Sequence, residues 1–211
     1  VLLFSGTACL VSYFLWLPRS WVVANGLIAP LLYLGAESNF PTAILLIVAI
    51  VLALIYLPAF WTRVPYYPTS LPMYQVILDQ LPGDRDFYFI DIGCGFGPLL
   101  EFLSRHRPLG KFDGIEIGIL PFLISKLRFL LLRRRNVSIS FKSMWTLNLA
   151  RYDFVYCFLS PAPMERLWNK AKSEMKPGTL FMTNTFQVPA SPERVINVKD
   201  KHSCKLYLHS L

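Results

Sequence analysis

The sequence predicts an α/β domain with a mostly parallel β-sheet, preceded in the chain by an apolar region. Two observations predict this organisation. Residues 1–60 contain only two charged residues, Arg19 and Glu37, whereas residues 61–211 hold 20 of the 21 Lys and Arg and 12 of the 13 Asp and Glu. In the second part, a strand-like run, a glycine-rich turn and a helical run follow one another over residues 87–106, as they do in sheets that bind nucleotides.

The apolar region contains three runs, at residues 1–17, 21–36 and 43–60. The last has 18 residues without a charge, and at about 1.5 Å per residue it reaches about 27 Å, close to the ~30 Å hydrocarbon core of a bilayer. We therefore expect a membrane region of two or three transmembrane helices over residues 1–61 and a second domain over residues 62–211. The positive-inside rule, applied to Arg19 and Arg63, predicts that the second domain is cytoplasmic.

The net charge of +8 arises entirely from the second part of the chain. Such a charge suits a domain beside an anionic membrane leaflet, and no motif for nucleic-acid recognition accompanies it, so we expect no nucleic-acid partner. The four cysteines are scattered and form no C-x-x-C pair. The sequence therefore indicates neither a disulfide framework nor a metal site.

The elements of the second domain begin after a proline-rich junction, residues 62–70. A helix is predicted over residues 71–81, a turn at residues 82–84 and a strand over residues 87–92. This strand runs into Gly93-Cys94-Gly95-Phe96-Gly97, and a helix is expected over residues 98–106. Glycines at such a turn let the backbone approach a ligand without a Cβ in the way.

Two acidic residues narrow the ligand class. Asp91 precedes Gly93 by two residues, and Glu116 ends a second predicted strand, residues 111–116. An acid at a strand end about 20 residues after the first strand is where ribose hydroxyls are held, and Glu116 lies 25 residues after Asp91. No Walker lysine follows the glycines, which argues against a nucleoside triphosphate.

These segments resemble, in order, the motifs of class I S-adenosylmethionine-dependent methyltransferases. Residues 91–97 resemble motif I and residues 114–116 the second motif, while residues 152–156 and 175–181 are similar to the fourth strand and the entry to the fifth. The resemblance implies S-adenosylmethionine as cofactor and a Rossmann-like seven-stranded methyltransferase sheet. Its last strands are expected near residues 195–198 and 204–208, with one antiparallel strand.

A closer resemblance is to membrane-anchored lysine methyltransferases that act on the ATP synthase c-subunit and the adenine nucleotide translocase, and to their bacterial relatives. It rests on residues 64–69, Trp145 and residues 158–164. It implies a multi-pass protein of the bacterial inner membrane that methylates an acceptor associated with the membrane, expected to be a protein lysine. The alternatives are a methyltransferase of a membrane lipid or quinone, and a non-catalytic cofactor-binding membrane scaffold.

The resemblance also assigns cofactor-binding residues. It implies that the glycine-rich segment shapes the loop around the cofactor, that Asp91 supports this loop or reaches the methionine amine, and that Glu116 holds the ribose hydroxyls. The full expected set is Asp91, Gly93, Cys94, Gly95, Gly97, Glu116, Ser143 and Trp145. At residues 143–145 the related group usually has Asp-Leu-Trp, whereas this chain has Ser-Met-Trp.

The candidates on the acceptor side follow the fourth strand or precede the first helix. Ser160 and Pro161 are expected to border the methyl group that is transferred. Tyr66 and Tyr67 are expected either to form a lid over the target or to anchor at a membrane interface. No dedicated catalytic base is identifiable from the sequence.

Overall fold

The computed structural model describes residues 43, 44, 46–48, 50, 67–200 and 203–211. The chain divides into two compact units, Val1–Ala53 and Leu54–Leu211, and the fold given below is that of the second. The predicted domain boundary at residues 61 and 62 lies outside the described residues and stays a prediction.

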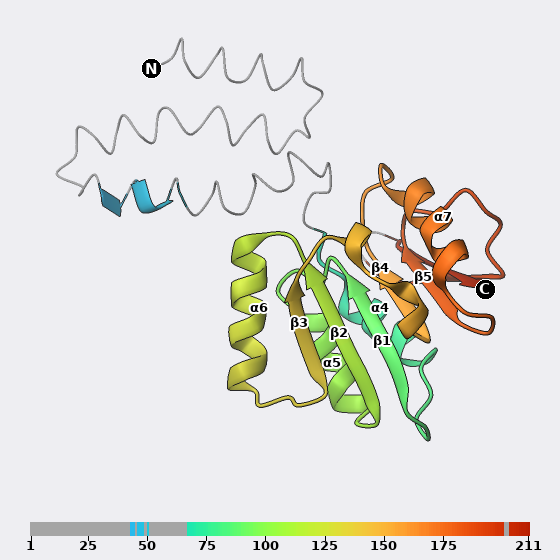
Figure 1. The fold of residues 1–211 in the computed structure, drawn as a ribbon, viewed down its shortest axis with the longest axis horizontal. Coiled ribbons are helices and arrows are strands. Elements are labelled where there is room, and N and C mark those ends of the chain that lie inside the picture. The colour runs from blue at the N-terminus through green and yellow to red at the C-terminus, as the bar shows by residue number, and fades with distance from the viewer. Residues whose placement is uncertain (1–42, 45, 49, 51–66, 201–202) are drawn as a thin grey trace, which may run out of the picture. The chain divides into compact units, whose positions relative to one another are not determined.

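The second unit is built on a seven-stranded sheet with the strand order β3-β2-β1-β4-β5-β7-β6 (Figure 1). Strands β1 to β5 are mutually parallel, and β7 is antiparallel to both of its neighbours. The strands are β1 (Phe87–Ile92), β2 (Gly110–Glu116), β3 (Val137–Phe141), β4 (Phe154–Cys157), β5 (Leu180–Asn184), β6 (Arg194–Asn197) and β7 (Lys205–Ser210). The helices are α4 (Leu71–Leu78), α5 (Pro98–His106), α6 (Ile119–Leu131) and α7 (Met164–Glu174), with short 3-10 turns η1 (Met144–Thr146) and η2 (Leu149–Arg151). The Rossmann-like seven-stranded sheet expected from the sequence is therefore confirmed.

The two faces of the sheet are covered by different helices, because successive side chains of a strand point to opposite faces. In β1, Phe87 and Phe89 pack with residues of α4, α5 and α6, whereas Ile90 and Ile92 pack with residues of α7 and η2. Asp91 shares the alternation of Phe87 and Phe89, so its carboxyl group belongs to the α5 face. It lies at the end of a strand that is buried on both sides.

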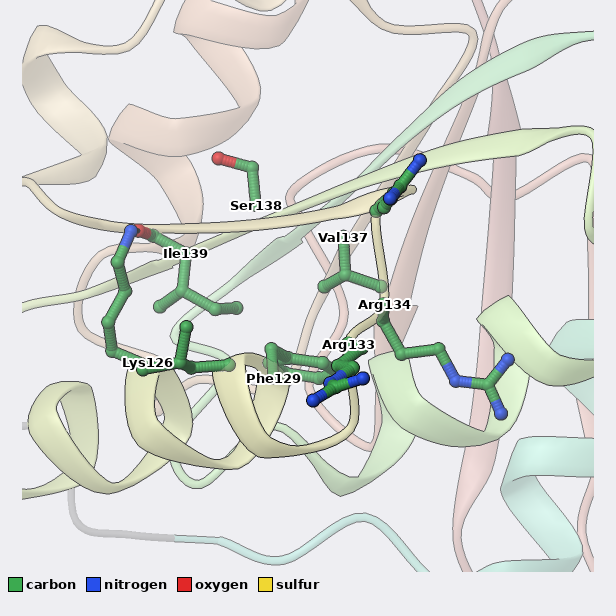
Figure 2. A pocket seen from close by; sticks show the side chains of 9 residues that line it. Lys126, Phe129, Arg133, Arg134, Val137, Ser138 and Ile139 are labelled. Atoms are coloured by element: carbon green, nitrogen blue, oxygen red, sulfur yellow. Dashed lines mark hydrogen bonds between the residues drawn. The ribbon is translucent and has the colours of Figure 1, made fainter.

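Strand β3 forms one edge of the described sheet, and α6 lies beside it (Figure 1). A groove of about 580 Å³ runs between the two and is lined by basic side chains, among them Lys126, Arg133 and Arg134 (Figure 2). The Lys126 ammonium donates a hydrogen bond to the Ile139 carbonyl of β3, at 3.2 Å. This hydrogen bond joins α6 to the edge strand.

The structure contradicts the predicted localisation, a multi-pass membrane protein with a cytoplasmic catalytic domain. Among the described residues, no helix is long and apolar enough to cross a bilayer. The longest helix in this part of the chain, α6, has 13 residues and so reaches about 20 Å, against the ~30 Å that a span requires. The three apolar runs lie outside the described residues, apart from residues 43, 44, 46–48 and 50.

Candidate active site

The glycine-rich turn after β1 adopts a backbone that favours glycine. Gly93, Gly95 and Gly97 have φ values of 80°, 55° and 78°, in the left-handed region that other residues enter at a cost. The amides of Gly93 and Cys94 both donate to the Ile115 carbonyl of β2, at 2.9 and 3.0 Å. These bonds fold the turn back over the carboxyl end of β2.

The neighbours of the turn lie too close for larger residues. A Cβ on Gly97 would lie 2.7 Å from Cε2 of Phe129, and one on Gly93 would lie 3.1 Å from Cδ2 of Leu159. Gly114 of β2 is equally constrained, since a Cβ there would lie 2.6 Å from Leu100. The glycines therefore let the turn and β2 pack closely against these side chains.

Glu116, the last residue of β2, binds three backbone amides. One carboxylate oxygen accepts from Gly95 at 2.9 Å, and the other accepts from Ile117 and Gly118 at 2.8 and 2.7 Å. A carboxylate has about four acceptor sites, so it can still accept a hydroxyl donor. Glu116 therefore fixes the loop and keeps room to bind a ligand.

Asp91 lies at the bottom of the same site and is 5% exposed. Burial, and secondly the neighbouring Glu116 carboxylate, raise the pKa of Asp91 to about 8. Both causes disfavour the ionised form. Without a cationic partner, this carboxyl group is largely protonated at neutral pH.

Cys94, one of the expected cofactor-binding residues, has its side chain in the core. Its side chain is 6% exposed and packs in the core on the α5 face, beside the position of Gly114. Burial is the main reason that the pKa of this thiol lies well above its usual range. Only the backbone of Cys94 can therefore face a ligand in the turn.

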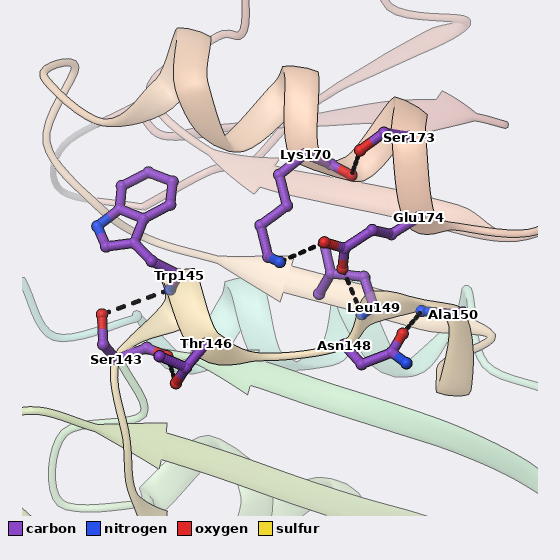
Figure 3. Close-up of polar contacts among 9 residues, drawn as sticks. All are labelled: Ser143, Trp145, Thr146, Asn148, Leu149, Ala150, Lys170, Ser173 and Glu174. Atoms are coloured by element: carbon purple, nitrogen blue, oxygen red, sulfur yellow. Dashed lines mark hydrogen bonds and ion pairs between the residues drawn. The ribbon is translucent and has the colours of Figure 1, made fainter.

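Ser143 and Trp145 lie in the connection that follows β3. The Ser143 hydroxyl accepts from the Trp145 amide at 3.4 Å, and the Arg166 guanidinium lies 4.0 Å from the centre of the Trp145 ring. Further along, the Glu174 carboxylate of α7 accepts from the Leu149 amide at 2.9 Å and pairs with Lys170 (Figure 3). Contacts of Trp145 with Arg166 and of Leu149 with Glu174 thus hold the connection against α7, and Ser143 caps its own turn.

The segment after β4 contains a buried hydroxyl group that lacks a partner. Ser160 is 6% exposed, and its Oγ has no hydrogen-bond partner among the described residues. Pro161 beside it is exposed. A buried polar atom without a partner costs free energy, which a bound ligand can recover.

Tyr67 lies at this same edge and contacts two phenylalanine rings. Its ring is stacked on Phe158, with centroids 5.3 Å apart, and tilted against Phe186 at 5.9 Å. Tyr66 lies outside the described residues. No role was expected for Phe158 or Phe186, although an aromatic residue within two positions of the end of each of two adjacent strands was a usable signal.

The chain's residues fit S-adenosylmethionine. The glycine turn packs closely on Phe129 and Leu159, Glu116 lies at the end of β2 for ribose hydroxyls, and Asp91 is a buried acid beside them. All lie at the carboxyl ends of parallel strands, and the strand order reverses between β1 and β4. Open α/β sheets bind their ligands at such a switch point.

Comparisons with known proteins point to the same cofactor. Residues 91–194 match the ANTKMT methyltransferase domain. A protein-lysine N-methyltransferase of Saccharolobus islandicus is 26% identical over 156 residues, which cover 69% of this chain and 94% of that protein.

Solved structures agree on the fold. An RNA methyltransferase from Salinibacter ruber, in complex with S-adenosyl-L-homocysteine, superposes with a TM-score of 0.60 at 19% identity and covers 68% of this chain and 93% of its own. A methyltransferase dependent on S-adenosylmethionine from Aquifex aeolicus gives a TM-score of 0.52 at 15% identity, with 67% and 92% covered. At such identities the likeness concerns the fold alone.

The sheet, the glycine turn and the acid at the end of β2 define a class I methyltransferase that uses S-adenosylmethionine. Within this class, residues 91–194 are similar to the ANTKMT-type methyltransferase domain, and the chain is similar to a protein-lysine N-methyltransferase. The non-catalytic scaffold that the sequence left open is thereby set aside.

Proposed function

We propose that the chain transfers a methyl group from S-adenosylmethionine to the side-chain amine of a protein lysine. The observation that carries this proposal is the match of residues 91–194 to the ANTKMT methyltransferase domain. The similarity to a protein-lysine N-methyltransferase over 94% of that protein supports the same acceptor class.

In this proposal the cofactor is held between β1 and β3. Glu116 accepts hydrogen bonds from the ribose hydroxyls while it keeps Gly95 in place, and Asp91 accepts from the methionine amine. Gly93, Gly95 and Gly97, with the backbone of Cys94, form the wall of the cradle. Ser143 and Trp145 border the adenine, with Ser143 standing where the related group has an aspartate.

The acceptor enters beside β4, where Ser160, Pro161 and Tyr67 lie next to the cradle. When bound, S-adenosylmethionine supplies an electrophilic methyl group, which passes to the lone pair of the amine as the carbon–sulfur bond breaks and its electron pair returns to sulfur. The chain's residues contribute binding and alignment, which can lower such a barrier by several kcal/mol. Because the attacking amine must be neutral, the lysine loses its proton to water beforehand.

The test is to follow tritium from methyl-labelled S-adenosylmethionine in a cell extract to which the purified full chain is added. Protein and chloroform-soluble fractions are counted separately, and the protein is hydrolysed to identify the labelled amino acid. We expect the label in methylated lysine. Label in the chloroform fraction, in another amino acid or in neither fraction would overturn the proposal.

Two variants calibrate this assay. Glu116→Gln removes the charge that we assign to ribose binding, so label transfer should fall at least 100-fold. Asp84→Asn makes the same chemical change at an exposed turn residue and should leave transfer unchanged. Equal activity of both variants would contradict the role of Glu116.

A further inference from the structure

Three aromatic rings gather at the carboxyl ends of β4 and β5, and we name Tyr67, Phe158 and Phe186 the ring cluster. Their centroids lie 5.3 Å apart for Tyr67 and Phe158, 5.9 Å for Tyr67 and Phe186, and 6.4 Å for Phe158 and Phe186. Tyr67 is 38% exposed, and the two phenylalanines are partly buried. The two phenylalanines pack against the core, and Tyr67 presents aromatic surface to solvent beside them.

The ring cluster lies next to the cofactor cradle. Strand β4 pairs with β1 through Cys157 and Ile92, directly before Phe158 and the glycine turn respectively. Leu159, which follows Phe158, reaches within 3.1 Å of where a Gly93 Cβ would be. A ligand at the ring cluster therefore lies beside the glycine turn.

A chain of hydrogen bonds ties the segments of the ring cluster together. The Tyr156 hydroxyl bonds to Thr69 Oγ1 at 3.0 Å and accepts from Asn184 Nδ2 at 3.0 Å. Thr69 follows Tyr67 by two residues, and Asn184 precedes Phe186 by two. Asn184 is 1% exposed, so this chain joins the two segments from within the domain.

The backbone before Phe186 is strained. Thr185 has a φ of 64°, which is rare for a β-branched residue. Its amide donates to the Lys205 carbonyl at 2.7 Å, and its hydroxyl donates to Asn184 Oδ1 at 2.9 Å. Such strain persists only where surrounding contacts impose it, and it concentrates at functional sites. Here it sets the position at which Phe186 leaves β5.

We propose that the ring cluster is the binding site for the acceptor side chain, with its faces against the lysine methylenes and the methylated ammonium. This inference rests on the proposed function, since it takes lysine as the acceptor. Aromatic faces attract cations and pack against methylene chains, so they suit a side chain that is a long alkyl group ending in a charge. The buried Ser160 hydroxyl, two residues after Phe158, offers a polar group near the nitrogen.

The decisive measurement compares a charged and an uncharged probe. Nα-acetyl-Nε-trimethyllysine amide, and its isostere with carbon in place of the quaternary nitrogen, are each titrated into the full chain saturated with S-adenosylhomocysteine. A cation–π site should bind the charged probe about 5-fold to 30-fold more tightly. Equal binding of the two probes would overturn the proposal.

Three variants test which residues produce this preference. Phe186→Leu and Tyr67→Leu should each remove most of it, while the affinity for S-adenosylhomocysteine stays unchanged. Phe102→Leu is the matched control, because Phe102 is a partly buried ring that pairs with Tyr74. If Phe186→Leu fails to fold, Tyr67→Leu still tests the ring cluster, because replacing a partly exposed ring should leave the fold intact. A preference that survives in Tyr67→Leu and in any folded Phe186→Leu protein would refute the ring site.

The tritium assay separates this inference from the proposed function. Lysine methylation without any preference for the charged probe overturns the ring site and leaves the proposed function standing. A preference for the charged probe without lysine methylation supports the ring site as an ammonium site and overturns the proposed function.

Discussion

At the scale of single residues, the active site combines a buried acid with backbone conformations that glycine adopts most readily. Asp91 is a carboxyl group buried beside a second acid, and Gly93, Gly95 and Gly97 adopt left-handed backbone conformations. The burial of Asp91 costs folding free energy, whereas glycine adopts these φ values without strain. Both arrangements occur where the cofactor is expected to bind, so at Asp91 the chain trades stability for a preformed site.

The raised pKa of Asp91 predicts how stability depends on pH. Below about pH 4 the group is protonated in both states, and between about pH 4 and 8 it ionises only in the unfolded chain. Its contribution to stability is therefore present at low pH and is lost as the pH rises towards about 8. Asp91→Asn removes this loss.

We expect the free energy of unfolding of Asp91→Asn, relative to the natural protein, to increase by up to about 1.4 kcal/mol per pH unit within this window. Urea titrations at pH 5, 6, 7 and 8 measure it. Parallel pH profiles for the two proteins would show that Asp91 does not have the raised pKa.

Two glycines with similar φ values allow the free-energy cost of backbone strain to be measured apart from the cost of close contact. Gly97 and Gly178 have φ values of 78° and 82°, but only at Gly97 would a Cβ meet a neighbour. Gly178→Ala should cost about 1–2 kcal/mol for the backbone alone. Gly97→Ala should cost a further ~1–3 kcal/mol, because Phe129 must move. Denaturant unfolding of the two variants checks this, and equal losses would contradict it.

At the scale of elements, α6 buries few of its apolar side chains and exposes the others on its outer face. Phe129 is 6% exposed and packs against the α5 face of the sheet, whereas its neighbour Leu130 is 72% exposed. Leu123, Leu127 and Leu131 are also more than half exposed. The helix is therefore held to the domain by few of its apolar residues.

This division predicts opposite outcomes for two adjacent substitutions. Phe129→Ala should lower the free energy of unfolding by about 3–5 kcal/mol, the usual cost of emptying a buried aromatic site. Leu130→Ala should change it by no more than about 0.5 kcal/mol. Thermal or urea unfolding measures both. A large loss for Leu130→Ala would mean that this outer face is covered in the folded protein.

At the scale of the whole molecule, the parallel strands gather the candidate binding residues at one end of the sheet, where the strands reach their carboxyl ends. Strands β1 to β5 run in the same direction, so their carboxyl ends bring together the glycine turn, Glu116, Ser143 and the ring cluster. Helices cover both faces of the sheet.

A ligand that binds at this end of the sheet should therefore stabilise the entire domain. S-adenosylhomocysteine at 100 times its dissociation constant contributes about 2.7 kcal/mol, which raises the Tm of a domain of this size by roughly 5–10 °C. Thermal unfolding of the full chain with and without the ligand measures the shift. Glu116→Gln should abolish it and Asp84→Asn should retain it. An equal shift in both variants would argue against binding through Glu116.

The fold class and the glycine-rich turn could be predicted from the sequence, and the resemblance of its motifs to class I methyltransferases predicted the cofactor. These follow from local patterns, because a strand, a turn with positive φ and a helix each depend on residues close together in the chain. The helix expected at residues 71–81 ends at Leu78, and the strand expected from Lys111 begins at Gly110. The predicted multi-pass localisation is the one expectation that the structure contradicts.

The surroundings of these residues depend on how the whole domain folds. The core position of Cys94 and the raised pKa of Asp91 depend on burial. The hydrogen bond between Glu116 and Gly95 joins residues about 20 positions apart. The contact between Tyr67 and Phe186 joins residues more than 100 positions apart. Distances between such residues are set by strand order and by packing on the two faces of the sheet. No local pattern in the sequence encodes them, since they exist only once the sheet has formed.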